Sequence, residues 1–375
     1  MMHEATVQLE YAPLQDGLLL ARVCFNRPQA LNALDHSMIQ ELLVILDDIE
    51  ANPQVVCVWI ESVTERAFCA GGDVRDVTDQ GRAGGLIDLS HASAYLADEY
   101  LLDVRLRLSP KPVIAWGDGY ILGGGMGVFQ GAHIRIVTPH SQLAMPEVRI
   151  GFVPDCGGSW FLNRVPYGLG QALAMSGVMV NAADALYLNL ADWRLPRQAK
   201  ADVLALLQGV AWGSGDALSL IKACIQSQQC PEEGHPSGWA TQGPALAADI
   251  RHHTPSAVWA VLERWAERDP ELMHGLELAS PGAALIAGYQ FQRAHLQNIG
   301  QCVIQEHDLG MRLLQDGEWC EGVRALLIDK DKTPRWRFGS VADVEPSWIT
   351  AMMSPMDWPG GHPLKRALAA HAIAH

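Results

Sequence analysis

Glycine is concentrated in two short stretches, AFCAGGD at residues 67–73 and GYILGGGMG at residues 119–127. Each stretch follows a continuously apolar run, 55–60 or 113–116, which is typical of a strand buried on both faces. Because glycine tolerates positive φ and close approach, such turns can present bare backbone N–H groups. For either turn alone, a packing role is an equal alternative. The two turns together favour a pair of donors for one oxyanion, and hence chemistry on an activated carbonyl such as a thioester.

Two acids follow the second turn. Glu147 stands directly after Met145 and Pro146, at the end of a predicted strand, where sites gather in α/β folds. Asp155 lies in a later turn that is rich in proline and glycine. A carboxylate at either position can move a proton at a reacting carbon. The alternatives are an exposed ion pair for Glu147 and a helix cap for Asp155.

The composition is that of a folded protein with one large domain or two smaller ones. The 375 residues are 49% hydrophobic and 18% charged. The formal net charge of −15 argues against general nucleic-acid binding, which needs a basic surface. Three arginines near the first turn, Arg27, Arg66 and Arg75, can still bind the phosphates of a large substrate. Solvated surface arginines are the default interpretation of all three.

The cysteines and the N-terminus indicate a cytoplasmic protein. The eight cysteines are scattered without a C-x-x-C pair, so reduced thiols are expected and no zinc site is predicted. Cys69 and Cys156 lack an identifiable histidine partner and are interpreted as buried structural thiols. The chain begins without a secretory pattern and contains no apolar run long enough to span a bilayer. No membrane or nucleic-acid partner is therefore expected.

The order of apolar runs predicts an α/β fold with mostly parallel strands. Asp35 is expected to cap a helix that runs to about Ile49. The segment 227–244 is expected to be a surface loop, because it is polar and contains glycine and proline. The other predicted strands are 7–11, 18–25, 55–60, 113–116, 134–137 and 142–144, and the predicted helices are 89–108, 182–190, 200–208, 257–267 and 283–295.

The segment from Asn26 to Asp155, through both glycine turns, resembles the crotonase superfamily, also called the enoyl-CoA hydratase/isomerase family. The resemblance implies a crotonase-like ββα spiral core with an acyl-CoA site at residues 1–195, and a helical region packed on it at 196–375. It implies that the N–H groups of Gly72 and Gly124 bind the thioester oxygen. It also implies that the carbonyl of Ala70 accepts from the adenine of coenzyme A, which is part of the substrate.

One departure from the hydratases is informative. Hydratases carry a first catalytic glutamate just past the second glycine turn, where this chain has Gly127. The branch with this pattern is that of the 3-hydroxyisobutyryl-CoA hydrolases, which the chain resembles at 66–73, 98–100, 123–127, 152–155 and 321–331. The resemblance implies hydrolysis of a 3-hydroxyacyl-CoA, as in valine breakdown. Glu147 is then the nucleophile or general base, Asp155 assists at the hydroxyl, and Glu99 and Arg27 bind substrate.

Three interpretations remain open at this level. The chain is a thioester hydrolase, a hydratase or isomerase of the same fold that uses Glu147, or a non-catalytic acyl-CoA-binding subunit. The hydrolase requires no metal or redox cofactor. Members of the family often assemble as trimers or their multiples, and the sequence leaves open whether this chain forms a homo-oligomer.

Overall fold

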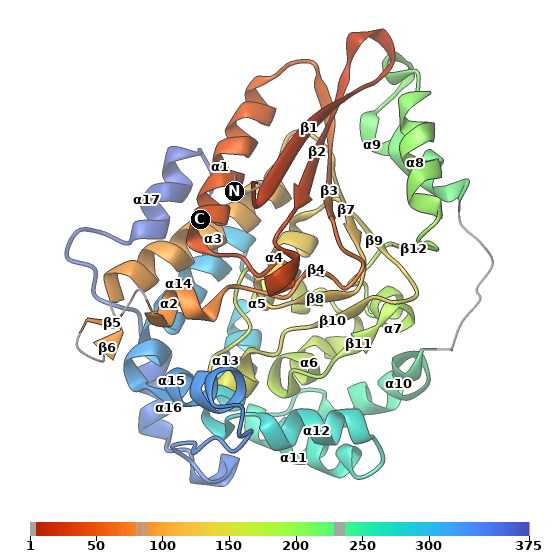
Figure 1. The fold of residues 1–375 in the computed structure, drawn as a ribbon. Coiled ribbons are helices and arrows are strands. Elements are labelled where there is room, and N and C mark those ends of the chain that lie inside the picture. The colour runs from red at the N-terminus through yellow and green to blue at the C-terminus, as the bar shows by residue number, and fades with distance from the viewer. Residues whose placement is uncertain (1–4, 80–81, 84–85, 88, 229–236, 375) are drawn as a thin grey trace. The chain divides into compact units, whose positions relative to one another are not determined.

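The computed structural model describes residues 5–79, 82–83, 86–87, 89–228 and 237–374, and Figure 1 shows its ribbon. The chain divides into two compact units. Unit 1 comprises Met1–Gly72, Leu102–Leu143 and Val180–Ser237, and unit 2 comprises Asp73–Leu101, Ala144–Met179 and Gly238–His375. The predicted boundary at residue 195 divides the chain differently and stays a prediction.

Unit 1 contains the sheets. Its six-stranded sheet has the order β1-β2-β3-β7-β9-β12, and its four-stranded sheet has the order β11-β10-β8-β4. Every paired neighbour in the larger sheet is parallel except the β1–β2 hairpin, which confirms the predicted α/β class. The elements are β1 (Val7–Pro13), η1 (Gln15–Gly17), β2 (Leu19–Phe25), η2 (Pro28–Ala30), α1 (His36–Ala51), β3 (Val55–Ser62), β4 (Ala67–Cys69), the end of α3 (Leu89–Leu108), β7 (Val113–Gly117), β8 (Tyr120–Leu122), α4 (Gly124–Gly131), β9 (Ile134–Val137), β10 (Gln142–Ala144), β11 (Val180–Asn181), α7 (Ala182–Tyr187), β12 (Trp193–Arg194), α8 (Ala199–Gln208), η5 (Trp212–Ser214) and α9 (Ala217–Gln226).

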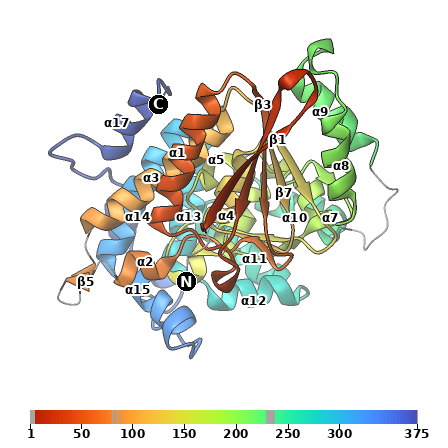
Figure 2. The same ribbon diagram turned by 45° about the horizontal axis from the view of Figure 1, so that its top comes forward.

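The core of unit 1 lies between the larger sheet and the helices α8 and α9. Figures 1 and 2 both show these helices, in green, along one side of the sheet. Trp59 of β3 and Trp116 of β7 stack with ring centroids 5.7 Å apart, and the apolar side chains of α8 and α9 belong to the same buried cluster. The sheet is thus held rigidly, and the loops at its strand ends are positioned by it.

Unit 2 is almost entirely helical. Its elements are α2 (Val74–Asp79), β5 (Arg82–Ala83), β6 (Leu86–Ile87), the start of α3, η3 (Glu147–Ile150), α5 (Gly158–Leu162), η4 (Pro166–Gly168), α6 (Gly170–Ser176), α10 (Gly238–Ile250), α11 (Pro255–Ala266), α12 (Pro270–Leu278), α13 (Pro281–Ala294), α14 (Ile299–Asp316), α15 (Glu318–Val323), η6 (Arg324–Ile328), η7 (Val341–Asp343), α16 (Pro346–Met352) and α17 (Pro363–Ala370). The helix α13, most of whose residues are buried, packs against α5, α6, α11 and α16.

Local sequence signals explain most element boundaries. Asp35 caps α1 by accepting from Met38 N–H at 2.9 Å, as predicted, and the helix buries Leu42, Leu46 and Ile49. The predicted loop at 227–244 is wrong in part, because α10 begins at Gly238 and contains Pro244. Proline removes only its own N–H, and burial of Leu246 and Ile250 supports the helix around it. Residues 229–236 lie outside the described part of the chain.

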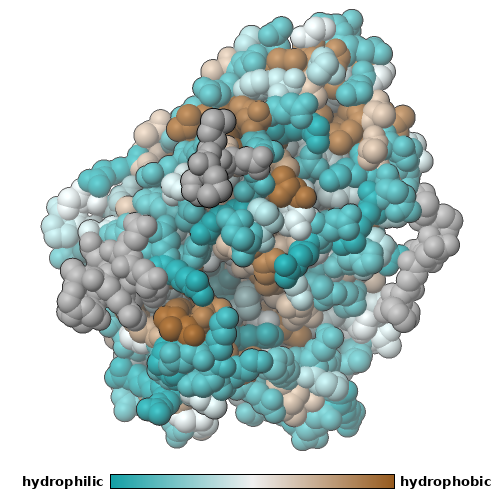
Figure 3. All heavy atoms as spheres, viewed as in Figure 1, coloured by the Kyte–Doolittle hydropathy of each residue, from teal (hydrophilic) through white to brown (hydrophobic). Residues whose placement is uncertain are grey.

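The surface and the thiols agree with the composition. The face in Figure 3 is mainly hydrophilic, with small separate hydrophobic patches. None of the described helices is long and apolar enough to cross a membrane. Seven cysteines are free thiols, and Cys69 and Cys156 are buried, as predicted. Cys230 is outside the described residues.

Candidate active site

The two glycine turns meet in unit 1. Strands β4 and β8 are parallel neighbours, so the turns that follow them lie next to each other. A Cβ atom built on Gly71 would lie 3.3 Å from the carbonyl oxygen of Leu122 and 3.7 Å from the nitrogen of Gly124. Gly71 has a φ of +108° and Gly123 a φ of +50°, values that L side chains rarely adopt. Glycine is therefore needed where the two turns make contact.

Gly72 and Gly124 are the residues predicted to supply the oxyanion donors. Gly124 is the first residue of α4, where N–H groups have no partner inside the helix. Within the described residues, neither of the two N–H groups donates a hydrogen bond to another protein group. Both are thus available to a ligand. Whether they bind one oxygen stays a prediction.

The remaining predicted residues of unit 1 are mostly engaged by the protein. Arg27 donates to the carbonyl of Ala33 at 2.8 Å, and its Nε lies 3.5 Å from the carboxylate of Asp35. Ala70, just after β4, donates its N–H to Leu31 at 3.1 Å. Their roles toward coenzyme A stay predictions. Gly127 lies buried inside α4, so that helix offers no carboxyl at the position of the hydratase glutamate.

Three of the predicted site residues are buried acids of unit 2. Glu147 begins η3 directly after Pro146, Asp155 lies in the turn before α5, and Glu99 lies on α3. Their exposed fractions are 7%, 6% and 3%, respectively. Oε2 of Glu147 and Oε1 of Glu99 are buried without a hydrogen-bond partner among the described residues. Carboxyl groups held in this way are typical of a reaction site.

The turn that follows Glu147 is fixed by its packing. Gly151 ends η3 with a φ of +69°, and a Cβ atom there would lie 2.6 Å from the backbone of Glu318. The carbonyl of Val148 accepts from Ser280 N–H at 2.8 Å, at the start of α13. The helix α13 and the element α15 thus hold η3, and Glu147 with it.

Tyr100 gives Asp155 its hydrogen bond. The phenol Oη donates to Oδ2 of Asp155 at 2.6 Å, and both groups are buried. One carboxyl oxygen of Glu99, one carboxyl oxygen of Asp155 and Sγ of Cys156 all lie within 4.8 Å of one another. The carboxyls are therefore close enough to influence each other's charge.

Burial raises the pKa values of all three acids, and the charge of Asp155 raises those of Glu147 and Glu99 further. Burial, with the charge of Asp155 added, raises the pKa of Glu147 and of Glu99 well above their ordinary value of 4.5. Burial also raises the pKa of Asp155, to about 6, while the hydrogen bond from Tyr100 acts to lower it. The group therefore holds protons near neutral pH and can both accept and deliver them.

A second group of possible metal ligands is internally hydrogen-bonded. His307, Asp308 and His362 bring ligand atoms within 4.8 Å of one another. Nε2 of His307 lies 3.0 Å from the carbonyl of Ser93, Nε2 of His362 lies 3.4 Å from Asp308, and Trp358 donates to Asp308 at 2.7 Å. Burial lowers the pKa of His307 to about 4. These contacts place the cluster in a packed polar network, in which Nδ1 of His307 is buried without a hydrogen-bond partner among the described residues.

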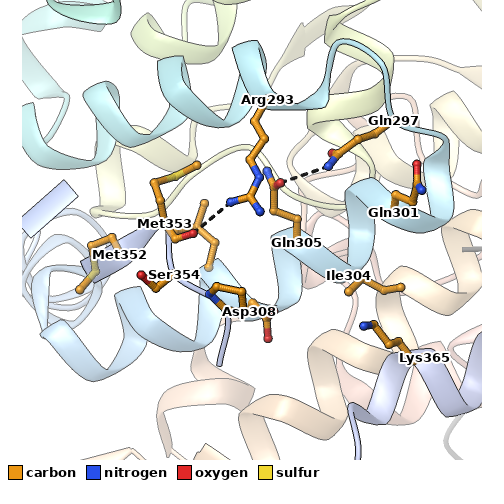
Figure 4. A pocket seen from close by; sticks show the side chains of 12 residues that line it. Arg293, Gln297, Gln301, Ile304, Gln305, Asp308, Met352, Met353, Ser354 and Lys365 are labelled. Carbon is orange, nitrogen blue, oxygen red and sulfur yellow. Dashed lines mark hydrogen bonds between the residues drawn. The ribbon is translucent and has the colours of Figure 1, made fainter. Parts of the chain in front are cut away.

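A separate pocket of unit 2 does not contain the predicted residues. Figure 4 shows it between α13, α14, α16 and α17, with Arg293, Asp308 and Lys365 among its lining side chains. Arg293 donates to the carbonyl of Met353 at 3.0 Å across it. The three acids are absent from its lining within the described residues.

Sequence reasoning missed two residues of this region. Tyr100 stands beside Glu99 in the quoted segment 98–100, and an aromatic residue next to a buried acid was the available signal. Glu306 accepts from the backbone beyond Asp155, but it lies about 150 positions later in no recognisable motif. Only the fold brings it to the site.

The chain is similar to known enzymes over most of its length. The family described as enoyl-CoA hydratase/isomerase matches residues 20–353. The chain is 29% identical to "3-hydroxyisobutyryl-CoA hydrolase, mitochondrial" of Gallus gallus over 339 residues, which are 89% of this chain and 86% of that protein. It is 30% identical to "Probable 3-hydroxyisobutyryl-CoA hydrolase 2" of Arabidopsis thaliana over 333 residues, which are 87% of this chain and 86% of that protein.

The fold is also found among solved structures. An enoyl-CoA hydratase from Rhodobacter sphaeroides 2.4.1 matches with a TM-score of 0.79 and 29% sequence identity. The match covers 94% of this chain and 98% of that chain. The predicted crotonase-like fold is therefore confirmed.

Proposed function

Because the chain belongs to the enoyl-CoA hydratase/isomerase family, we propose that it hydrolyses the thioester of a 3-hydroxyacyl-CoA, with 3-hydroxyisobutyryl-CoA as the favoured substrate. The relatives named 3-hydroxyisobutyryl-CoA hydrolase support both the reaction and the acyl group. The structural observation that carries the proposal is the group of three buried carboxyls, Glu147, Asp155 and Glu99. That substrate would connect the reaction with valine breakdown.

The oxyanion is assigned to the glycine turns. We propose that the N–H groups of Gly72 and Gly124 donate to the thioester oxygen, which becomes negative when the carbonyl carbon is attacked. Backbone donors of this kind cost no rearrangement during the reaction, and one of them contributes about 3 to 4 kcal/mol to the transition state. Their free hydrogen-bonding capacity among the described residues supports the assignment.

Glu147 is assigned the central step, by one of two routes. In the first route its oxygen attacks the thioester carbon, the C–S bond breaks, and water then cleaves the resulting anhydride. In the second route it takes a proton from water, whose oxygen attacks the same carbon. Both routes yield the free hydroxy acid and the thiol of coenzyme A. The raised pKa of Glu147 makes its ionised form a stronger base than an exposed glutamate.

Asp155 and Glu99 are assigned to the acyl group. The hydrogen bond from Tyr100 leaves Asp155 as the acid that ionises first, so it can accept from the substrate 3-hydroxyl. Glu99 keeps its proton to higher pH and can donate to the far end of the acyl group. A hydratase is the second candidate, because the Rhodobacter sphaeroides structure bears that name. The absence of a carboxyl at Gly127 speaks against two-glutamate addition of water.

Release of thiol from a panel of acyl-CoAs tests the proposal. The panel contains 3-hydroxyisobutyryl-CoA, 3-hydroxypropionyl-CoA, acetyl-CoA and crotonyl-CoA, and a disulfide reagent reports the free thiol. Fast release from the 3-hydroxy compounds alone is expected. Loss of the crotonyl absorbance without thiol release would instead identify a hydratase. Binding without any turnover would identify an acyl-CoA-binding subunit.

Replacement of Glu147 tests the assigned step. We expect Glu147→Gln to lower kcat for thioester cleavage by roughly 10²- to 10⁴-fold, because the amide is neither nucleophile nor base. Binding of the acyl-CoA should persist, which equilibrium titration of the variant checks. Glu267→Gln, at an exposed position of unit 2, is the control for the loss of one charge. Turnover retained in Glu147→Gln would remove this residue from the central role.

A further inference from the structure

The turn that carries Asp155 adopts a conformation that its own residues do not favour. Cys156 has a φ of +55° and Gly157 a φ of +77°, so two consecutive residues are left-handed. For a residue with a side chain this conformation costs roughly 1–2 kcal/mol. The turn leads into α5, which has only five residues and no side-chain cap of its own. Its own hydrogen bond, from Gly158 N–H to the carbonyl of Asp155 at 2.6 Å, is supplemented by contacts from elsewhere in the chain.

Three of those contacts come from one carboxylate on α14. Oε2 of Glu306 accepts from Gly157 N–H at 2.8 Å, and Oε1 accepts from Ser159 N–H at 2.9 Å and from its Oγ at 2.5 Å. The Glu306 side chain is completely buried. A buried carboxylate is costly unless hydrogen bonds satisfy it, and here three donors of one turn do so. Both oxygens are committed to the backbone next to Asp155.

The flanking residues connect the same helices to the other acids. Gln290 of α13 donates to the carbonyl of Pro154 at 2.9 Å, on the other side of Asp155. His307, the neighbour of Glu306 on α14, contacts the ring of Tyr100 edge-on, with centroids 6.3 Å apart. Tyr100 in turn donates to Asp155. One turn of α14 thus contacts both segments that fix the Asp155 carboxyl.

We propose that Glu306 is a positioning residue for the reaction: by binding Gly157 and Ser159 it holds the strained turn that aims Asp155 at the hydrogen bond from Tyr100. This inference rests on the proposed function for its kinetic consequence, but not for the anchoring itself. A merely structural cap of α5 would tolerate the loss of Glu306 without any change at Asp155. The two roles therefore predict different accessibility of Cys156, the residue between Asp155 and Gly157.

Alkylation of Cys156 measures the anchoring without any substrate. Cys156 is almost fully buried, and its Sγ lies within 4.8 Å of carboxyl oxygens of Glu99 and Asp155, so a small alkylating reagent reaches it only when the turn opens. In Glu306→Gln the amide NH₂ end would face an N–H donor, and at least one hydrogen bond is lost. We expect the rate at Cys156, followed by mass spectrometry of the full chain, to rise about tenfold or more. The buried Cys57 of unit 1 should be unaffected.

A matched control lies on the same helix. Asp316 is an acid of α14 with a side chain that is 7% exposed; it accepts from Trp348 at 3.0 Å and from Arg337 at 2.8 Å, and neither partner belongs to the Asp155 turn. Asp316→Asn should leave the Cys156 rate unchanged. If Glu306→Gln fails to fold, Ser159→Ala serves instead, because it removes one of the three donors and should give a smaller rise. An unchanged Cys156 rate in the folded Glu306→Gln protein would overturn the proposal.

Kinetics separate this proposal from the proposed function. If the wild-type chain hydrolyses a 3-hydroxyacyl-CoA, Glu306→Gln should lower kcat about tenfold while KM stays within about twofold. Equal loss in Asp316→Asn, or wild-type kcat in Glu306→Gln, would contradict a positioning role. If the wild-type chain releases no thiol from any substrate, the proposed function fails, and the Cys156 rate still decides whether Glu306 holds the turn.

Discussion

The pKa of Asp155 is set by burial against hydrogen bonds, of which the one from Tyr100 has the largest effect. Burial raises the pKa of its carboxyl, and the phenol of Tyr100, 2.6 Å away, acts to lower it. The outcome is a pKa of about 6. A group with this value changes its charge within the range in which an enzyme works, so its partner controls the pH dependence of the reaction.

Tyr100→Phe should therefore shift the pH dependence of hydrolysis. The variant removes the donor that favours the ionised carboxylate, so the pKa of Asp155 rises above about 6. If ionised Asp155 is required, the acidic limb of the kcat/KM profile moves to higher pH by up to about one unit. Tyr187→Phe is the control, because the buried Oη of Tyr187 has no partner among the described residues. A limb that stays in place would show that Asp155 is not the group titrating there.

Single residues of the site could be predicted from the sequence when a local pattern marked them, but not when their partner lies far away in the sequence. Glu147 was predicted from its place after a strand and Asp155 from its place in a turn rich in proline and glycine, whereas Glu99 was predicted from the family resemblance of segment 98–100; their roles stay predictions. Tyr100 and Glu306 were not predicted, because a hydrogen-bond partner has no signature of its own. Glu306 reaches Gly157 across 149 positions, and only the packing of α14 against α5 brings them together.

The helix α4 packs closely against the end of β4 because it has glycine at position 125. A Cβ atom on Gly125 would lie 2.3 Å from the carbonyl oxygen of Cys69, at the end of β4. That contact is impossible for any residue with a side chain unless the backbone moves. The glycine therefore determines how closely the helix approaches the strand, and with it the separation of the Gly72 and Gly124 donors.

Gly125→Ala should accordingly destabilise unit 1 and reduce turnover. Overpacking at a rigid backbone contact costs roughly 1–3 kcal/mol or more, and displacement of the donors should lower kcat in addition. Gly213→Ala is the matched control, since a Cβ atom there meets nothing within 4 Å. Urea unfolding and thiol release measure the two effects. Wild-type stability in Gly125→Ala would contradict the tight contact.

Helices and strands were easier to predict from the sequence than the hydrogen-bond partners of the site residues. The strands at 55–62 and 113–117 and the helix at 89–108 follow from local apolar runs, which the structure confirms. The exception is α10, where Gly238 and Pro244 indicated a loop. A helix that buries Leu246 and Ile250 draws its stability from tertiary contacts, and these are invisible in local composition.

At the scale of the whole molecule, the two units bury their acids differently. In unit 1, Glu61 is paired with Lys200 at 2.9 Å and Arg22 at 2.6 Å, and these partners lower its pKa although burial opposes them. In unit 2, burial and the charge of Asp155 raise the pKa of Glu147 and Glu99 well above 4.5, although Arg149 acts to lower that of Glu147. A pKa that differs between the folded and unfolded states makes the free energy of unfolding depend on pH. Because the pKa shifts have opposite signs, this dependence is opposite in the two units.

The sign follows from where each proton is held. A carboxyl with a raised pKa keeps its proton in the folded state at a pH where the unfolded chain has lost it. Unfolding then releases a proton, so the free energy of unfolding falls as pH rises. Glu306, with a pKa raised by burial from 4.5 to about 7, acts in the same sense. His307 acts oppositely, but its effect is complete above its ordinary value of 6.5.

Between pH 6.5 and pH 8, unit 2 should therefore lose stability and unit 1 should not. Glu61 contributes fully throughout this range, because its stabilisation is lost only when pH falls through its lowered pKa. For unit 2 we expect a fall on the order of 1 kcal/mol or more. Amide hydrogen exchange, corrected for intrinsic rates, resolves the two units by segment. Glu147→Gln should reduce the fall, because the amide has no proton to release. If the amides of α13 and α14 were equally protected from exchange at both pH values, this would contradict the raised pKa values of the buried acids in unit 2.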